Sequence, residues 1–375
     1  MTVSRRSFLH GLGSGAAAVP LIGGRGLEAL AGSTLRLVDP SGLIRIDSNE
    51  NPNGPSARAL EAIRGAFGEA CRYPRISSDK LTEALAAHHR VKPANLLVGC
   101  GSTDHLRLAV DAFTTPGRGL VTAAPSFETP ATYAALRGIP VESVPVDSGL
   151  GLDLNAMLDR SLGAGLVYVC NPNNPTGTVH SKAAVEDFIR RVLSKSPAVH
   201  VLVDEAYYEY VDDPEYGTLI PMALEDPRVM VLRTFSKVHG MAGLRVGYGI
   251  GRPETMAAML RFQMQLSVNG LGLSAALASL GDETHLARET KLNREARDFT
   301  RRWFGRYGFV VAPSATNFVM VAIRRPIEAF KKACADRGVA VGRPFPPLTE
   351  HARISIGTME EMQRAVGVFG QVLGV

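Results

Sequence analysis

The stretch that decides the fold is Val229–Arg245, which reads VMVLRTFSKVHGMAGLR. It begins with the apolar run Val229–Leu232, which has the length and composition of a buried strand. It continues into a polar loop that carries Ser236, Lys237 and, further on, Arg245. A lysine that directly follows a buried strand can be both shielded from water and reachable by a small molecule. The stretch therefore indicates a sheet whose strands end at a chemical site.

Lys237 has the surroundings that a Schiff-base lysine needs. Its amine must lose a proton before it can attack a carbonyl, and burial or nearby positive charge lowers the pKa of a lysine from about 10.4. Ser236 and Arg245 supply a hydroxyl and a guanidinium that suit an anionic phosphate. The cofactor that this combination suggests is pyridoxal 5′-phosphate (PLP). A single Ser-Lys pair carries little weight, so the prediction depends on the neighbouring motifs.

Short apolar runs alternate with helix-length amphipathic segments from about residue 95 to 251. This rhythm predicts an α/β fold with a mostly parallel sheet and helices on both faces, and a ligand site at the carboxyl ends of the strands. The expected strands are Leu96–Gly99, Leu120–Ala123, Val141–Val146, Leu166–Cys170, Val201–Val203, Val229–Leu232 and Val246–Ile250. The expected helices between them include Thr103–Phe113, Thr129–Leu136 and Lys182–Leu193.

The chain divides into four expected parts. Residues 1–31 are an N-terminal signal, and residues 32–70 pack on the smaller domain or across a dimer interface. Residues 71–270 form the large PLP-binding domain, and residues 271–375 form a small C-terminal α+β domain. Within the last part, the expected strands are Phe318–Ala322, Val339–Val341 and Arg353–Ile356. One long helix, Leu286–Arg306, is expected to cross between the lobes.

The composition is that of an ordinary globular enzyme. The 375 residues are 45% hydrophobic and 21% charged, with a formal net charge of +5, and a chain of this length can form two lobes. No basic block or aromatic-basic pattern indicates nucleic acid binding. The cysteines show neither metal-ligand nor disulfide-framework spacing, so no metal site is expected, while disulfide pairing stays open. They are Cys71, Cys100, Cys170 and Cys334.

The N-terminus resembles a twin-arginine export signal. The segment Ser4-Arg5-Arg6-Ser7-Phe8-Leu9-His10 precedes a weakly apolar stretch over Gly11–Ile22, and Ala29-Leu30-Ala31 offers a small-x-small cleavage site. We therefore expect export to the periplasm by the twin-arginine machinery, a route that suits proteins folded around a cofactor. The alternative is a frayed basic terminus on a cytoplasmic protein.

Two loops after expected strands carry candidate cofactor ligands. Gly99–Asp104 combines backbone N–H groups at a helix start with the hydroxyls of Ser102 and Thr103, which together make an anion site. The alternative is a plain capping turn. Asn171–Gly177, NPNNPTG, is either a structural turn or a rigid holder of Asn174, whose amide N–H₂ can donate to a phenolate oxygen.

Asp204 follows the apolar run Val201–Val203, and a carboxylate at the end of a buried strand is costly unless it is paired. The expected partner is the protonated pyridine nitrogen of PLP, which keeps the ring able to accept electrons. A helix cap is the alternative. Tyr207 could donate to the ring hydroxyl, and Phe127 could stack on the ring, although an aromatic side chain in a loop is more often part of a core.

Together these motifs resemble fold-type I PLP enzymes of the class I/II aminotransferase superfamily, in particular its histidinol-phosphate aminotransferase branch. The resemblance extends from Asp47 to about Thr358 and implies a mostly parallel, seven-stranded large domain plus a smaller α+β domain. Its marks in chain order are Asn49-Glu50-Asn51-Pro52 with Gly54-Pro55, Arg72-Tyr73-Pro74, the Gly-Ser-Thr turn, Asn-Pro-Asn-Asn-Pro-Thr-Gly, Asp-Glu-Ala-Tyr, Ser-Lys with Gly-Leu-Arg-Val-Gly, and Arg353-Ile-Ser-Ile-Gly-Thr.

The resemblance implies a catalytic role for Lys237, Asp204 and Tyr207. Lys237 would hold the cofactor and move the substrate proton, while Asp204 would pair with the pyridine nitrogen. Asn174 and Tyr207 would bond the ring oxygen, and Phe127 would stack on the ring. The residues expected around the cofactor phosphate are Ser102, Thr103, Ser236 and Arg245.

The resemblance also implies a homodimer with shared active sites, in which Tyr73 reaches the phosphate of the partner's site. Arg353 is expected to clamp the α-carboxylate of the substrate in a bidentate fork, unless it is a surface arginine on an edge strand. Arg343 matches a position that contacts the distal phosphate in phosphate-using relatives, which favours an anionic side chain. Relatives commonly carry tyrosine where Asn53 stands, near the substrate side chain, which argues against a simple transfer of specificity.

The sequence therefore predicts a PLP-dependent aminotransferase that acts on an L-amino acid, or a histidinol-phosphate-like amine, and a 2-oxo acid. Histidine biosynthesis is a cytoplasmic pathway, which does not fit an exported enzyme. The amino donor and the amino acceptor therefore stay open. A decarboxylase resembling the threonine-phosphate branch, or an amino-acid oxidase, would use the same fold and cofactor site. A PLP-binding sensor without turnover is a further alternative, but relatives of that kind carry a DNA-binding domain, and none is visible in the sequence.

Overall fold

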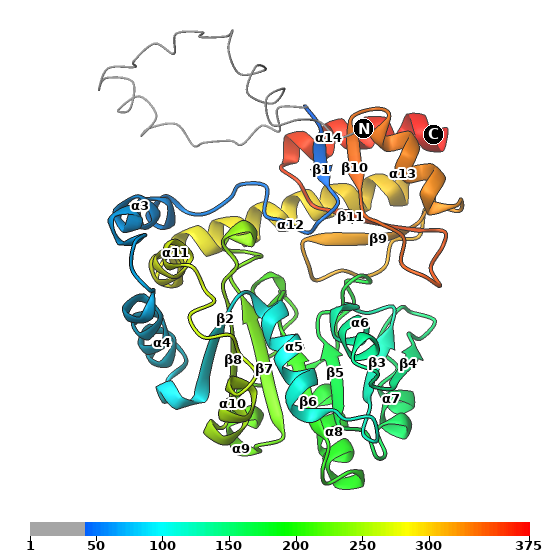
Figure 1. Cartoon of the computed structure of the whole chain (residues 1–375). Helices are drawn as coiled ribbons and strands as arrows, with labels where there is room; N and C mark the ends of the chain where they lie inside the picture. Colours follow the sequence, from blue (N-terminus) through cyan, green and yellow to red (C-terminus); the bar gives the residue numbers. More distant parts are fainter. Residues whose placement is uncertain (1–41) are drawn as a thin grey trace, which may run out of the picture. The chain divides into compact units, whose positions relative to one another are not determined.

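The computed structural model describes residues 42–375 (Figure 1). The expected export signal over residues 1–31 lies outside the described residues, as does the first part of the segment 32–70. Within residues 42–375, no helix is long and apolar enough to cross a bilayer. The same residues contain no group of His, Cys, Asp and Glu side chains that could hold a metal ion.

A seven-stranded sheet forms the centre of the larger lobe, in the order β2-β8-β7-β6-β5-β3-β4 (Figure 1). Strand β8 runs antiparallel to both of its neighbours, and the other pairs are parallel. The predicted mostly parallel α/β sheet is thus confirmed. The strands are β2 (Leu96–Gly99), β3 (Leu120–Ala124), β4 (Val141–Pro145), β5 (Leu166–Cys170), β6 (His200–Asp204), β7 (Val229–Thr234) and β8 (Gly247–Gly251).

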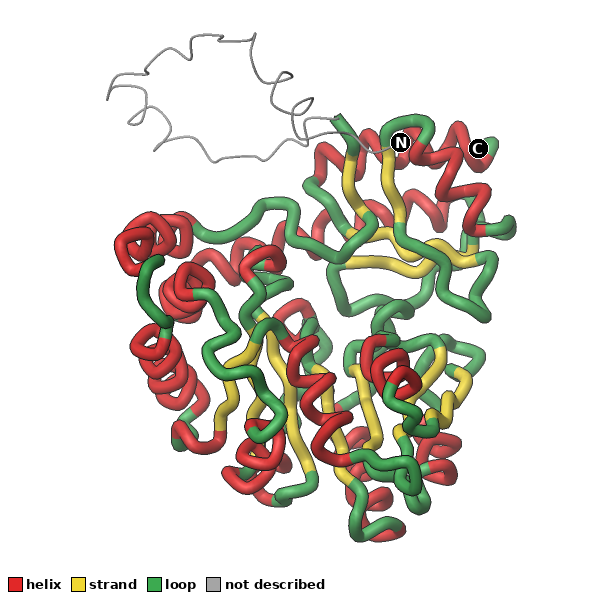
Figure 2. The backbone as a smooth tube through the Cα atoms, viewed as in Figure 1, coloured by secondary structure: helices red, strands yellow, loops and turns green. Residues whose placement is uncertain are grey.

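The central strands are buried on both faces because helices cover the sheet from two sides (Figure 2). In β6, Val201 and Val203 join the core on one face, while Leu202 joins the core on the other. This double burial explains why the strands read as continuous apolar runs. The helices of this lobe are α3 (Ala57–Ala66), α4 (Arg75–His89), α5 (Ser102–Phe113), α6 (Thr129–Leu136), α7 (Leu154–Arg160), α8 (Lys182–Lys195), α9 (Ile220–Glu225), α10 (Pro253–Leu260) and α11 (Gly270–Leu280).

The smaller lobe contains two short sheets and its own hydrophobic core. Strand β9 (Phe318–Ala322) pairs antiparallel with β11 (His351–Ser355), and β10 (Val339–Val341) pairs parallel with β1 (Ile44–Ile46). The helices here are α12 (Glu283–Arg306), α13 (Ile327–Ala335) and α14 (Met359–Leu373). Short 3₁₀ turns complete the described chain: η2 (Phe67–Glu69), η3 (Pro93–Asn95), η4 (Tyr208–Tyr210) and η5 (Ala242–Leu244).

Strand β1 was not among the expected strands, and it matters for the site. Its three residues pair with β10, so the chain that follows, from Asp47 to Asn53, contacts residues of both lobes. The start of α12 has a side-chain cap, because Oδ1 of Asp282 accepts from the backbone N–H of His285. The long helix therefore begins at Glu283, three residues before the expected Leu286.

Candidate active site

A cavity of about 370 Å³ lies beyond the carboxyl ends of the parallel strands and brings side chains from both lobes together. This is the position at which open α/β sheets bind ligands. Its lining comes from the segment after β1 (Asp47, Ser48, Asn49), from the larger lobe (Phe127, Glu128, Asn174, Lys237) and from the smaller lobe (Lys331, Val341, Arg343, Arg353). Lys237, Asn174, Phe127, Arg343 and Arg353 were all expected at the site.

Lys237 follows β7, and its amine projects into this cavity from a largely buried position. The Nζ donates a hydrogen bond to the backbone oxygen of Asn49 at 3.1 Å and lies 5.5 Å from the centre of the Tyr207 ring. Burial, followed by the positive charge of Arg353, lowers the pKa of Lys237 to about 8. A useful fraction of this amine is therefore neutral, and nucleophilic, near neutral pH.

Asp204 ends β6 and is 3% exposed. Its Oδ2 accepts a hydrogen bond from the hydroxyl of Tyr168 at 3.0 Å, and its Oδ1 accepts from the backbone N–H of Ala206 at 3.1 Å. Burial raises the pKa of Asp204 to about 6. Both of these donors are neutral, so the buried carboxylate has no cation hydrogen-bonded to it within the described chain. A protonated ring nitrogen fits that need.

Asn49 connects the N-terminal segment to the site, a role that the sequence analysis did not assign to it. Its Nδ2 donates to the hydroxyl of Tyr207 at 3.1 Å, and Ser355 bonds both its backbone N–H and its Oδ1 at 2.8 Å. Its backbone is left-handed, with φ of 55°. Burial raises the pKa of Tyr207, so this phenol stays protonated and can donate.

Arg353 lies on β11 and is 8% exposed. Its Nη1 donates to Oδ1 of Asn174 at 2.8 Å, and its Nη2 donates to the backbone oxygen of Asp47 at 2.7 Å. Its Nε has no hydrogen-bond partner, and no carboxylate of residues 42–375 forms an ion pair with it. Burial lowers its pKa to about 10, so it remains a cation. A buried cation without an anion fits the carboxylate of a substrate.

Four residues expected around a phosphate lie together at the start of α5. Ser102 opens this helix, and its N-cap is Gly101, which has φ of 74° and offers no side-chain cap. The backbone N–H groups of the first turn, near Ser102 and Thr103, are therefore left for an anion. Nη1 of Arg245 donates to Oγ of Ser236 at 3.2 Å, and a Cβ on Gly101 would lie only 2.3 Å from Nη2 of Arg245.

Tyr73 and Asn53 were also expected at the site, but neither lines the cavity of this chain. Tyr73 precedes α4 and is 85% exposed. Asn53 donates from Nδ2 to Oε2 of the buried Glu289 on α12 at 2.7 Å, instead of facing the cavity. The roles proposed for both stay predictions. Phe127 lines the cavity and also packs against a hydrophobic core of the larger lobe, while its stacking on the cofactor ring stays a prediction.

The fold and the motifs together place the chain in the class I and II aminotransferase family. The model of that family matches residues 41–369, and the chain belongs to it. The predicted class of enzyme, and the fold-type I architecture, are thereby confirmed.

Its relatives include histidinol-phosphate aminotransferases. The one from Symbiobacterium thermophilum is 38% identical over 335 residues, which cover 88% of this chain and 91% of the relative. That of Moorella thermoacetica is 36% identical, with 88% and 86% covered. Among solved structures, the histidinol-phosphate aminotransferase from Sinorhizobium meliloti, in complex with pyridoxal-5′-phosphate, superimposes with a TM-score of 0.82 at 29% identity, covering 95% of this chain and 96% of that one.

Proposed function

We propose that the protein is a PLP-dependent aminotransferase that uses Lys237 to move an amino group between an L-amino acid, or a histidinol-phosphate-like amine, and a 2-oxo acid. Membership of the family supports the reaction, and the PLP-bound relative supports the cofactor. The observation that carries the proposal is the buried Nζ of Lys237, whose pKa is lowered to about 8 in a cavity that also holds the unpaired guanidinium of Arg353.

The residues of the site fit the cofactor from end to end. When bound, PLP supplies an aldehyde that takes up amino groups and a ring that withdraws electrons from the substrate. Asp204 would meet the ring nitrogen, and Tyr207 with Asn174 would hold the ring oxygen. Because Oδ1 of Asn174 already accepts from Arg353, its amide N–H₂ is left to donate. The phosphate would rest on the start of α5 between Ser102, Thr103, Ser236 and Arg245.

Arg353 and Lys237 would divide the work on the substrate. The guanidinium of Arg353 would bind the α-carboxylate of an amino acid, or the phosphate of a histidinol-phosphate-like amine. This contact would fix the position of the α-carbon within the cavity. The neutral Nζ of Lys237 would take the proton from that carbon and deliver it to the cofactor side, a contribution of about 10²–10⁴-fold to the rate. Asn49 accepts a hydrogen bond from this Nζ through its backbone oxygen and so orients it.

The test is a screen of the purified, PLP-loaded protein. L-Amino acids and L-histidinol phosphate serve as donors, and pyruvate, 2-oxoglutarate and oxygen serve as acceptors. Formation of a new amino acid with the matching oxo product supports transamination. Release of carbon dioxide without amino transfer would point to a decarboxylase, and release of peroxide would point to an oxidase. No turnover with any donor would contradict the proposal.

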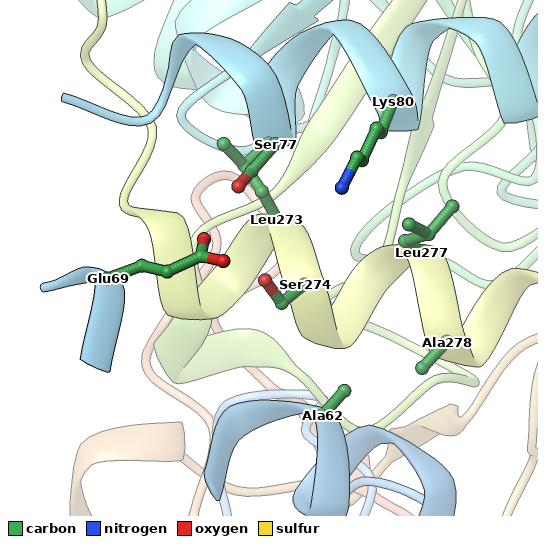
Figure 3. Close-up of a pocket in the computed structure, with 8 residues that line it drawn as sticks. All are labelled: Ala62, Glu69, Ser77, Lys80, Leu273, Ser274, Leu277 and Ala278. Atoms are coloured by element: carbon green, nitrogen blue, oxygen red, sulfur yellow. The ribbon is translucent and has the colours of Figure 1, made fainter. Parts of the chain in front are cut away.

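A homodimer with shared active sites is the second part of the proposal. A groove of about 350 Å³ lies between α3, α4 and α11, with Ser77 and Leu277 on facing helices (Figure 3). Large apolar side chains beside it are exposed, among them Phe67, Ile76 and Leu277 itself. Exposed patches of this kind mark protein interfaces. A second copy is the occupant that we propose, because Tyr73 sits on this face and does not line its own chain's cavity.

Mixed dimers test the shared sites. We expect Tyr73→Ala to weaken PLP binding and Lys237→Ala to abolish turnover when each variant is alone. If each site takes Tyr73 from the partner, a mixture of the two variants contains heterodimers with one intact site, and about a quarter of the wild-type activity returns. A monomeric protein by sedimentation, or no recovery on mixing, would contradict the shared site.

Export through the twin-arginine route is the third part of the proposal, and it is supported by the arginine pair Arg5-Arg6, the apolar stretch and the cleavage site within residues 1–31. We propose that the chain folds around its cofactor before crossing the membrane. Replacing both residues with lysine should retain the protein in the cytoplasm of the producing bacterium, with its full length and its enzyme activity intact. Unchanged extraction from the periplasm would contradict this part without affecting the proposed reaction.

A further inference from the structure

Asn317 is a buried amide to which the chemistry of the site assigns no role. It directly precedes β9 in the smaller lobe, and 1% of its surface is exposed. Its Nδ2 donates to the backbone oxygen of Asn49 at 2.9 Å and to that of Glu50 at 3.3 Å. Because two carbonyl oxygens face this nitrogen, the orientation of the amide is fixed. Asn317 therefore holds the backbone that follows β1.

The other end of this amide bonds nothing. Oδ1 of Asn317 is buried and has no hydrogen-bond partner within residues 42–375. A buried acceptor without a partner lowers the stability of a protein, and such violations are expected at functional positions. The side chain is thus held through its nitrogen alone, by the carbonyl groups of Asn49 and Glu50.

The backbone oxygen of Asn49 is shared by donors from the two lobes. Nδ2 of Asn317 reaches it from the smaller lobe, and Nζ of Lys237 reaches it from the larger lobe at 3.1 Å. A carbonyl oxygen has two lone pairs and can accept both bonds. Within residues 42–375, this oxygen is the one hydrogen-bond acceptor of the Lys237 amine. A displacement of the oxygen would therefore move the amine.

Asn49 has little freedom around this carbonyl. Oγ of Ser355 accepts from its backbone N–H and donates to its Oδ1, both at 2.8 Å. The φ of 55° is uncommon for a residue other than glycine, and it persists only where the surrounding contacts enforce it. Ser355 and Asn317 are those contacts on the side of the smaller lobe.

The segment after β1 also contacts the loop that carries Lys237. Nδ2 of Asn51 donates to the backbone oxygen of Val238 at 2.9 Å. A Cβ on Gly240 would lie 2.1 Å from the oxygen of Gly54, so the two backbones are in direct contact there. The segment thus binds both the side chain of Lys237 and the residues that follow it.

A fixed acceptor matters for a lysine that reacts. The side chain is long and flexible, and it loses rotational freedom whenever its amine must lie at one place. An amine that is already held there does not lose this freedom during the reaction. Asn317 does not line the cavity, so its effect on the amine must pass through Asn49.

We propose that Asn317 is a positioning residue for Lys237: it fixes the Asn49 carbonyl, which holds the free amine where it captures the cofactor and moves the substrate proton. This inference rests on the proposed function and adds a residue to the machinery of the same site. Ser355 supports the same carbonyl from the other side of Asn49.

The rate of PLP uptake by the apoprotein tests this role. Stopped-flow absorbance follows uptake as the pH rises, and the plateau of the rate reports the neutral amine. Asn317→Ala removes the donor to the carbonyl, so its plateau should fall about tenfold, as for loss of one hydrogen bond that positions a reacting group. Thermal unfolding establishes that each variant is folded. A wild-type plateau in a folded Asn317→Ala would overturn the proposal.

Asn293→Ala is the matched control. Nδ2 of Asn293, on α12, donates to the backbone oxygen of Thr316 at 3.2 Å, so this amide bonds the same loop as Asn317 occupies but does not contact Asn49. Arg297 donates to the same oxygen, which therefore keeps a partner in the variant. The control should take up PLP within about twofold of the wild-type rate. Equal losses in the two variants would show a general effect on the loop and would contradict the proposal.

A double-variant cycle tests whether Asn317 and Ser355 act on one carbonyl. Ser355→Ala should also lower the plateau about tenfold, and Asn317→Ala combined with Ser355→Ala should lower it little further, because either change already frees Asn49. Independent effects would instead multiply to about a hundredfold, and that result would contradict a shared action.

Asn317→Asp provides a test that needs no cofactor. The variant keeps the shape of the side chain and puts a carboxylate near the amine, so the pKa of Lys237 should rise by about one unit or more. Competitive acetylation with acetic anhydride, mapped by mass spectrometry, measures this pKa, and Asn293→Asp should shift it by less than about half a unit. The charged groups already around the amine are Arg353, Glu50, Asp204 and Arg245.

The acetylation result also separates this inference from the proposed function. An unshifted pKa of Lys237 in Asn317→Asp would overturn the positioning role, even in a protein that transaminates. The expected shift in a protein that turns over no donor would support the positioning role and contradict only the reaction. The same measurement decides the question if Asn317→Ala does not fold.

Discussion

The inner and outer ends of the active-site cavity control charge in opposite ways. Near the inner end, Asp204 is buried and Lys237 is largely buried, and loss of hydration moves their pKa values to about 6 and about 8. At the outer end, Glu128 and Arg343 are half exposed and face each other through water-accessible contacts. Burial gives large effects that resist salt, whereas an exposed pair gives small, exchangeable ones. Buried groups with shifted pKa values are suited to catalysis, whereas an exposed, exchangeable ion pair is suited to substrate selection.

The largest effect should come from removing the amine at the inner end. Lys237→Ala eliminates both the group that holds the cofactor and the base that moves the proton, so turnover should fall by at least about a thousandfold. Steady-state assays of the PLP-loaded protein measure it. Lys195→Ala, which removes an exposed lysine paired with Asp159, is the control and should retain full activity.

Asp204→Asn should have the next largest effect. The variant removes the buried carboxylate that would pair with the ring nitrogen, and losing one partner of a buried charge pair costs about 3–5 kcal/mol. Affinity for PLP and turnover should together fall about a hundredfold to several thousandfold. Equilibrium dialysis with PLP and the steady-state rate measure the two parts. Wild-type values for both would mean that the carboxylate does not meet the ring.

The pH dependence of cofactor loading tests how far burial shifts Lys237. Only the neutral amine reacts, and its fraction falls tenfold for each pH unit below the pKa. Because the folded-state pKa is lowered to about 8, the rate of PLP uptake by the apoprotein should rise with pH up to about 8 and then level off. Stopped-flow absorbance records it. A rate that keeps rising toward pH 10 would show an unshifted, solvated lysine.

Tyr168→Phe tests the hydrogen bond behind Asp204 and should have a smaller effect. The variant keeps the ring and removes the hydroxyl that donates to Oδ2, so affinity for PLP should fall about tenfold, as for loss of one hydrogen bond to a charged group. The pH profile of PLP binding should shift as well, because the carboxylate loses a donor that lowers its pKa. Tyr133→Phe, whose hydroxyl bonds Asp111 elsewhere in the larger lobe, is the control and should change neither.

Raising the salt concentration should produce the smallest effect. It should affect the outer end of the cavity more than the inner end. Raising ionic strength from about 0.05 to 0.5 M screens exposed charges, so binding of glutarate, an unreactive dicarboxylate that would contact Arg353 and the exposed Arg343, should weaken by a fewfold. The loading rate at fixed pH should change much less, since it depends on buried groups. Calorimetry and stopped-flow absorbance on the same preparation compare them. Equal salt dependence of glutarate binding and of the loading rate would contradict the proposed difference between the two ends.

The sequence was sufficient for features that depend on local pattern. The strand that begins at Val229 could be predicted because its residues Val229–Leu232 are all apolar, as is typical of a strand buried on both faces. Lys237 and Asp204 could be placed because Asp204 ends such a strand and Lys237 lies on the loop just after another. Strand β1 could not, because three residues, Ile-Arg-Ile, are too short to show a period.

Other features depend on contacts between distant parts of the chain. The role of Asn49 comes from its left-handed backbone and its bonds to Ser355, 306 positions away. Tyr168 looked like one more apolar strand residue, and only the parallel pairing of β5 with β6 brings its hydroxyl to Asp204. The pair of Glu128 and Arg343 spans 215 positions and both lobes. No local pattern encodes such pairings.

The most direct test of the central claim is to locate the cofactor on the chain. The purified, PLP-loaded protein is reduced with borohydride, digested and mapped by mass spectrometry. The account predicts a single phosphopyridoxyl group on the peptide that contains Lys237, and none on that peptide in Lys237→Ala. A label on any other lysine, or a protein that takes up no PLP at all, would contradict it.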